Sequence, residues 1–185
     1  YGPWQFPEKL IPVVTLKAIV GESIPLYGDG LNVRDWLYVE DHVDALLLAA
    51  TRGRVGDHYC VGGAGDHGSA SERSNRDVVE TICSILDRIR PQNEPYASLI
   101  KRVSDRPGHD RRYAIDASKI SKELGWKPKH SFEEGLQATV EWYLQNLDWC
   151  QKVREQSGYD GERLGLTDQS AVSGSCGRLK LHCEL

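Results

Sequence analysis

The chain has 185 residues, of which 39% are hydrophobic and 27% charged, and its formal net charge is -4. This composition is ordinary for a folded domain, and the acidic balance argues against general binding to nucleic acid, which needs a basic surface. Five widely spread cysteines argue against a disulfide framework and fit a cytoplasmic protein, and no apolar run approaches the roughly 18 residues of a membrane helix.

The first residues, YGPWQFPEKLIP, read as a turn, and the chain contains no methionine. A translated protein usually begins with methionine or with a small residue left after its removal, so we expect a fragment of a longer protein. Residues 8–21 then place apolar side chains at helical spacing, and Gly21 is suited to end the helix. We expect this helix to bend or restart at Pro12.

Two extended segments and a helix are expected next. Residues 23–30, SIPLYGDG, predict a short strand that ends in a turn. Residues 34–40, RDWLYVE, are aromatic and β-branched and predict a second strand or extended segment. Asp41 is then expected to cap a helix that ends at Gly53.

The middle of the chain alternates in the same way. Residues 57–63, DHYCVGG, predict a strand, and residues 63–74 predict a flexible loop because glycine, serine and aspartate dominate them. Ser74 or Asn75 is expected to cap a strongly amphipathic helix. Its apolar face comprises Val78, Val79, Ile82, Leu86 and Ile89.

Further elements follow the prolines at 91 and 95. Residues 99–105 predict a strand, and Asp116 is expected to cap a short helix that ends at Gly125. Ser131 and Glu134 have the spacing of a capping box and are followed by apolar residues at helical intervals. An amphipathic helix is therefore expected after Ser131.

The end of the chain changes in character. A last helix is expected over 148–156, whereas residues 157–185 lose apolar periodicity and read as a disordered or non-native tail. The ordered part is thus expected to comprise residues 1–156. Because helices and strands alternate without repeats, the predicted fold class is α/β.

One glycine motif has the formal spacing of a dinucleotide site. Gly63, Gly65 and Gly68 match G-x-G-x-x-G directly after a predicted strand. No apolar helix begins within the motif, and no following strand ends in an acidic residue at the required distance. The motif is therefore interpreted as a loop.

Other catalytic and metal-binding patterns are missing from the sequence. None of the eight tyrosines has a lysine four residues later, and no G-x-S-x-G nucleophile turn occurs. Three ligand-type residues near the end of the chain match no zinc pattern: Cys176, His182 and Cys183. No metal site is expected.

The segment SDRPGHDRRYAID places Arg106, His109, Arg111 and Arg112 around a Pro-Gly turn. Guanidinium groups on a rigid turn suit a diphosphate, because arginine offers planar donors and a permanent charge. A solvated loop with local ion pairs explains the pattern equally well. The sequence leaves both interpretations open.

Arg34 raises the same question. Its charge could be paired within the fold by an acid such as Asp35, or it could be available to a ligand. Lys9, Arg34 and Arg106 belong to three different loops or element ends, which is how α/β folds assemble phosphate sites.

Four stretches jointly resemble the dTDP-glucose 4,6-dehydratases, a family of extended short-chain dehydrogenases/reductases. They are YGPWQFPEKLIP, IPLYGDGLNVRDWLYVEDHVDAL, DRPGHDRRYAIDASKISKELGWKP and SFEEGLQATVEWYL. The resemblance covers about residues 1–150 in order and points to the carboxyl-terminal half of the family. It implies the carboxyl-terminal portion of a Rossmann-type enzyme, mainly its small α/β substrate-binding domain.

In this family, a Rossmann domain binds NAD, and the enzyme converts dTDP-glucose to dTDP-4-keto-6-deoxyglucose. The smaller domain holds the nucleotide sugar, so the resemblance assigns binding roles to specific residues here. These are Glu8, Lys9, Leu10, Ile11, Pro12, Val13, Val14, Pro25, Leu26, Tyr27, Arg34, Asn75, Asp105, Arg106, Pro107, Gly108 and His109.

The resemblance also limits what is expected of this chain. The family's glycine-rich loop, Tyr-x-x-x-Lys pair and Asp-Glu acid/base pair have no counterpart in it, so we expect binding without catalysis. The parent enzyme is expected to be a homodimer. The alternatives are a fragment of another nucleotide-sugar epimerase, decarboxylase or reductase, and a non-catalytic nucleotide-binding module.

Overall fold

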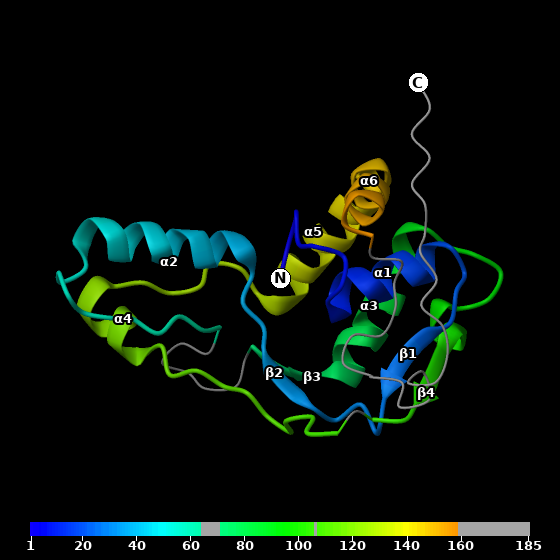
Figure 1. Ribbon diagram of the computed structural model, residues 1–185, viewed down its shortest axis with the longest axis horizontal. Coiled ribbons are helices and arrows are strands. Elements are labelled where there is room, and N and C mark those ends of the chain that lie inside the picture. The colour runs from blue at the N-terminus through cyan, green and yellow to red at the C-terminus, as the bar shows by residue number, and fades with distance from the viewer. Residues whose placement is uncertain (64–70, 106, 159–185) are drawn as a thin grey trace, which may run out of the picture.

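The computed structural model describes residues 1–63, 71–105 and 107–158 (Figure 1). Helices and short strands alternate along the chain, as the sequence predicts. The elements are α1 Leu10–Ile19, β1 Ile24–Tyr27, β2 Val33–Asp35, α2 Val39–Arg52, β3 Glu72–Ser74, α3 Asn75–Ile89, a 3₁₀ turn η1 at Tyr96–Leu99, β4 Ile100–Val103, α4 Ser118–Leu124, α5 Phe132–Gln145 and α6 Leu147–Ser157.

The main core lies between α1, α3 and α5, with β1 at its side (Figure 1). Helix α3 buries the apolar face that its periodicity predicts, including Val78, Ile82 and Leu86. Leu136 and Val140 of α5 complete the core from the opposite side. Burial of these side chains away from water is the main stabilising contribution to this part of the fold.

The strands form two small pairs. Strand β1 pairs in parallel with β4, so that Tyr27 lies opposite Val103. Strand β2 pairs antiparallel with β3, and an isolated parallel bridge joins Val33 to Arg112. Segments distant in sequence are therefore brought side by side at the ends of β1 and β2.

Helices α2 and α4 form an arm on the other side of β2 and β3 (Figure 1). The arm has a smaller core of its own, whose buried members are Ala45, Ala117, Ile120 and Trp126. Asp41, only 1% exposed, ties the arm to the start of α5 by accepting the backbone N–H groups of Lys129 and His130 at 3.0 and 3.2 Å.

Two predicted helix starts are wrong. Helix α2 begins at Val39 with Tyr38 at its N-cap, because Asp41 turns into the protein to receive the bonds described above. Helix α4 begins after Ala117, although the Asp116 carboxylate still accepts the Ser118 N–H at 2.8 Å.

The expected bend at Pro12 is also wrong. Helix α1 begins at Leu10, so Pro12 lies in its first turn, where the missing N–H has no helical partner to lose.

The region before α3 differs from the prediction in three ways. Residues 57–63 form no strand, and the predicted extended segment at 34–40 contributes only Arg34 and Asp35 to β2. The predicted loop contains β3, which the strand partner β2 holds in place. The remaining loop residues, 64–70, lie outside the described residues, as does most of the predicted tail.

Candidate functional site

Arg34 is half-buried, and no carboxylate of the described residues pairs with its guanidinium group. Its Cζ lies 4.4 Å from the centroid of the Tyr113 ring, and its Nη1 donates to the Val33 carbonyl at 2.7 Å. The neighbouring Asp35 instead accepts the Gly63 N–H and the Ser71 hydroxyl. In the part of the chain that the structure describes, no carboxylate oxygen lies within 4.0 Å of the Arg34 nitrogens, so the positive charge is available to a ligand.

Two other arginines of the predicted phosphate segment are paired within the fold. Arg111 donates to both carboxylate oxygens of Asp29 at 3.1 Å. Arg112 forms a two-pronged pair with Glu72 at 2.7 Å for each bond, which lowers the pKa of Glu72. For these two residues the structure favours the local ion-pair interpretation that the sequence left open.

The rest of that segment is held near the end of β1. His109 Nδ1 lies 2.7 Å from Asp105 Oδ1, and Arg106 lies outside the described residues. Gly28 has a φ of +58°, and a Cβ atom there would lie 3.0 Å from Asp105 Oδ2. The close approach and the left-handed backbone both favour glycine at this turn.

The turn between β1 and β2 brings several predicted residues together. The Asn75 N–H at the start of α3 donates to the Asn32 carbonyl at 2.9 Å, and Asn32 Nδ2 donates to the Asp110 carbonyl at 3.2 Å. Asn32 is 3% exposed, and its Oδ1 has no hydrogen-bond partner among the described residues. The β1 end, Arg34, Asn75 and the segment after β4 therefore share one region of the molecule.

The predicted residues of α1 have a different environment. Lys9 occupies the N-cap position, is 63% exposed in its side chain and pairs with Glu8 at 2.7 Å. Ile11 and Val14 are 1% exposed, so their side chains belong to the core and leave only backbone atoms for a ligand. Among the described residues, no recorded contact joins Lys9 to Arg34, although α1 packs against β1.

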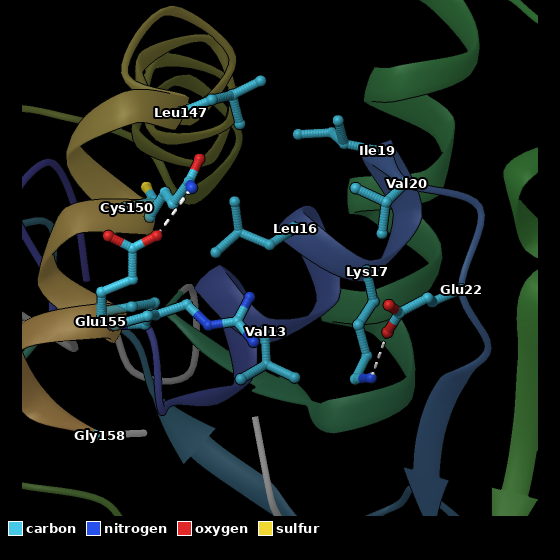
Figure 2. Close-up of a pocket in the computed structure, with 13 residues that line it drawn as sticks. Val13, Leu16, Lys17, Ile19, Val20, Glu22, Leu147, Cys150, Glu155 and Gly158 are labelled. Carbon is cyan, nitrogen blue, oxygen red and sulfur yellow. Dashed lines mark hydrogen bonds and ion pairs between the residues drawn. The ribbon is translucent and has the colours of Figure 1, made fainter. Parts of the chain in front are cut away.

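A groove of about 650 Å³ lies between α1 and α6 (Figure 2). Its walls include the apolar side chains of Val13, Leu16 and Leu147, and its Lys17 ammonium is paired with Glu22 at 2.8 Å. Of the predicted site residues only Val13 lines it. Arg154 also lines the groove, so positive charge is present there, but neither Lys9 nor Arg34 contributes to its lining.

The glycine motif does not fit a dinucleotide pyrophosphate. The Gly63 N–H is already bound by the Asp35 carboxylate at 3.0 Å, and this negative charge would repel a phosphate. Strand β3 precedes α3, so the helix begins at Asn75 and not within the motif. Gly65 and Gly68 lie outside the described residues. The described part of this motif is therefore not a pyrophosphate site.

Neither a membrane-spanning helix nor a cluster of metal ligands is found in the described residues. No helix in the described segments is long and apolar enough to cross a membrane. Within residues 1–63, 71–105 and 107–158, no three potential ligands from histidine, cysteine, aspartate and glutamate are grouped to hold a metal ion. The three residues rejected as zinc ligands lie outside these ranges.

Two residues that the sequence did not single out belong to the site. Tyr113 stacks on Arg34, and Asn32 links the β1–β2 turn to the segment around Asp110. An aromatic residue directly after two arginines was a usable signal for Tyr113, whereas Asn32 carried none, because its role depends on burial.

Residues 1–139 match the model of the family described as GDP-mannose 4,6 dehydratase. The chain belongs to this family. The resemblance to dTDP-glucose 4,6-dehydratases is also confirmed: the enzyme of that name from Xanthomonas campestris pv. campestris strain B100 is 54% identical over 169 residues, which are 90% of this chain and 46% of the relative. The chain thus spans about half the length of the curated relatives it matches.

Solved structures of the dehydratase family agree with this assignment and with the predicted fold class. The dTDP-glucose 4,6-dehydratase of Bacillus anthracis, in complex with NAD, is 46% identical with a TM-score of 0.70, over 83% of this chain and 44% of the other. The enzyme from Streptomyces venezuelae, with NAD and TYD bound, is 39% identical with a TM-score of 0.73 over the same shares. A UDP-glucose 4-epimerase from Thermotoga maritima is 31% identical with a TM-score of 0.66, over 80% of this chain and 44% of the other.

Proposed function

We propose that this dehydratase-family chain holds the dTDP part of dTDP-glucose and that Arg34 binds its diphosphate. The available, half-buried charge of Arg34 carries the proposal, since a guanidinium without a carboxylate partner attracts an anion. Identity of 54% to dTDP-glucose 4,6-dehydratases supports dTDP as the nucleotide.

We propose the remaining binding roles from the places of the residues in the fold. Tyr27 ends β1 and offers an aromatic face to the base, while Asn75 opens α3 beside the β1–β2 turn. Lys9 and the N-terminal end of α1 add positive potential, because the first turn of α1 contains no acidic residue. The exposed pair between Lys9 and Glu8 is weak and exchanges readily for a phosphate contact.

The activity of the whole enzyme is part of the same proposal. A complete dTDP-glucose 4,6-dehydratase would form dTDP-4-keto-6-deoxyglucose, with NAD accepting and returning a hydride, and it would act as a homodimer. We infer that this chain orients the nucleotide sugar without carrying the reaction, because the sequence has no Tyr-x-x-x-Lys pair and the Gly63 N–H is bound by Asp35. Catalysis requires the hydride carrier, base and acid in one geometry.

Calorimetric titration of dTDP into the 185-residue chain tests the binding role. We expect saturable binding that Arg34→Gln weakens by about tenfold or more, the loss typical of a hydrogen bond to a charged group. Arg52→Gln is the matched control, because Arg52 is exposed at the end of α2. No saturable binding, or equal effects of the two substitutions, would contradict the proposal.

A turnover assay tests the claim that the chain is inactive alone. Incubation of the chain with dTDP-glucose and NAD should yield no keto sugar, and measurable product would refute this part. Parallel titration with UDP separates the dehydratase from the epimerase alternative that the 31% identical structure represents. Tighter binding of UDP than of dTDP would favour the alternative.

A further inference from the structure

Backbone hydrogen bonds between Val33 and the segment of Arg111 and Tyr113 hold Tyr113 beside Arg34. The Val33 N–H donates to the Arg111 carbonyl at 2.8 Å, and the Tyr113 N–H donates to the Val33 carbonyl at 3.1 Å. These bonds form the isolated bridge that aligns the segment after β4 with β2. The position of the tyrosine relative to Arg34 is therefore fixed by main-chain geometry.

The tyrosine side chain is also fixed at its far end. Its hydroxyl donates to the Asp110 carboxylate, and its ring lies 4.4 Å from Arg34 Cζ. A guanidinium over an aromatic face is attracted by the negative charge of that face, and it keeps its outer N–H groups free for an anion. A carboxylate partner would hold Arg34 equally well but would cancel its charge.

We propose that Tyr113 is a positioning residue for diphosphate binding and that it acts by holding the Arg34 guanidinium in a fixed, uncompensated orientation. This inference rests on the proposed function. Tyr113 is half exposed, so its ring stays beside Arg34 because of the bonds described above and not because of burial in the core. Without the ring, Arg34 becomes free to adopt other rotamers, and ordering it again reduces the binding affinity.

The test is dTDP titration of a double-mutant cycle in the 185-residue chain. Tyr113→Leu should weaken binding by about two- to fivefold, the size of an exposed cation–π contact. Tyr113→Phe should weaken it less, because the ring remains although the hydroxyl bond to Asp110 is lost. In the Arg34→Gln background, Tyr113→Leu should have no further effect, because its partner is already gone. A merely structural role would lower the affinity in both backgrounds.

Tyr59→Leu is the matched control, since the Tyr59 ring lies 5.0 Å from the Lys119 ammonium in the arm, away from Arg34. It should leave dTDP affinity unchanged, and circular dichroism of each variant reports whether the fold is retained. If the unsubstituted chain binds dTDP and Tyr113→Leu binds equally well, the inference alone is overturned. If the unsubstituted chain shows no saturable binding, the proposed function is overturned and the inference with it.

Discussion

Single arginines with the same charge have opposite roles in this molecule. Arg112 meets both oxygens of Glu72, whereas Arg34 meets an aromatic ring and one carbonyl. The first arrangement joins β3 to the segment after β4, and the second leaves a charge available for a ligand. At this scale, the neighbour of each guanidinium decides between structure and binding.

The Glu72–Arg112 pair predicts a pH dependence of stability. Its hydrogen bond and the nearby positive charge lower the pKa of Glu72 below the ordinary value of 4.5. The folded state thus holds fewer protons than the unfolded state, so the stabilisation is complete above pH 4.5 and is lost as the pH falls through the lower folded pKa. Glu72→Gln should reduce the melting temperature by a few degrees at pH 7, and the difference should vanish towards pH 3.

Glu94→Gln serves as the control for this measurement, because Glu94 is exposed and no ion pair with a described residue is recorded for it. Thermal unfolding at several pH values should show little difference between this variant and the unsubstituted chain. An equal loss for Glu72→Gln at pH 3 and pH 7 would contradict the ion-pair explanation.

Helix α3 shows how element ends are specified. Its N-cap Ser74 accepts the Asp77 N–H at 3.1 Å, and the Asp77 carboxylate accepts the Ser74 N–H at 3.1 Å, which completes a capping box. The same residue ends β3, so the cap also fixes where the strand passes into the helix. The helix start beside Asn75 therefore depends on a local interaction that the sequence encodes.

Ser74→Ala should lower the free energy of unfolding by about 1 kcal/mol, because the Asp77 N–H loses the Ser74 hydroxyl as its acceptor. Ser84→Ala in the same helix is the control: Ser84 is exposed, and alanine favours the helix. Chemical denaturation followed by circular dichroism measures both. A loss for Ser84→Ala as large as that for Ser74→Ala would contradict the capping role.

At the scale of the whole molecule, the described residues form two cores of unequal size. The main core includes six buried residues of α3, whereas α2 buries only Asp41 and Ala45. Three apolar side chains of α2 remain about half exposed: Val43, Leu46 and Leu47. Local unfolding of the arm of α2 and α4 therefore exposes less apolar surface to water than unfolding of the main core does. The free energy of local unfolding should be lower in the arm.

Hydrogen exchange followed by mass spectrometry should reveal this difference. We expect central amides of α2 to exchange at least about tenfold faster than those of α3, relative to their intrinsic rates. Asp41→Asn should accelerate exchange in the arm further while leaving α3 unchanged, because Asp41 joins the arm to the start of α5. Equal protection of α2 and α3 would show that the molecule opens as one unit.

Much of the fold was predictable from local patterns. The helices α3 and α5 have capping boxes and apolar periodicity, and Gly125 ends α4 in a left-handed conformation, as expected. The failures occur where a tertiary partner competes with the local signal. Asp41 resembles an N-cap but is taken by Lys129 and His130, and β3 resembles a loop but is stabilised by pairing with β2.

By itself, the sequence determined the α/β class, the helices with strong periodicity, and the residues that resemble a dehydratase. It did not decide which arginines are paired with a carboxylate. The carboxylate partner of Arg111 is 82 residues away along the chain and that of Arg112 is 40 residues away, whereas Arg34 donates to the carbonyl of the adjacent Val33. Only the tertiary structure assigned Asp29 and Glu72 to two of them and left Arg34 against Tyr113. The physical reason is that helix and turn signals act over a few residues, whereas the compensation of a charge depends on which distant segments the fold brings together.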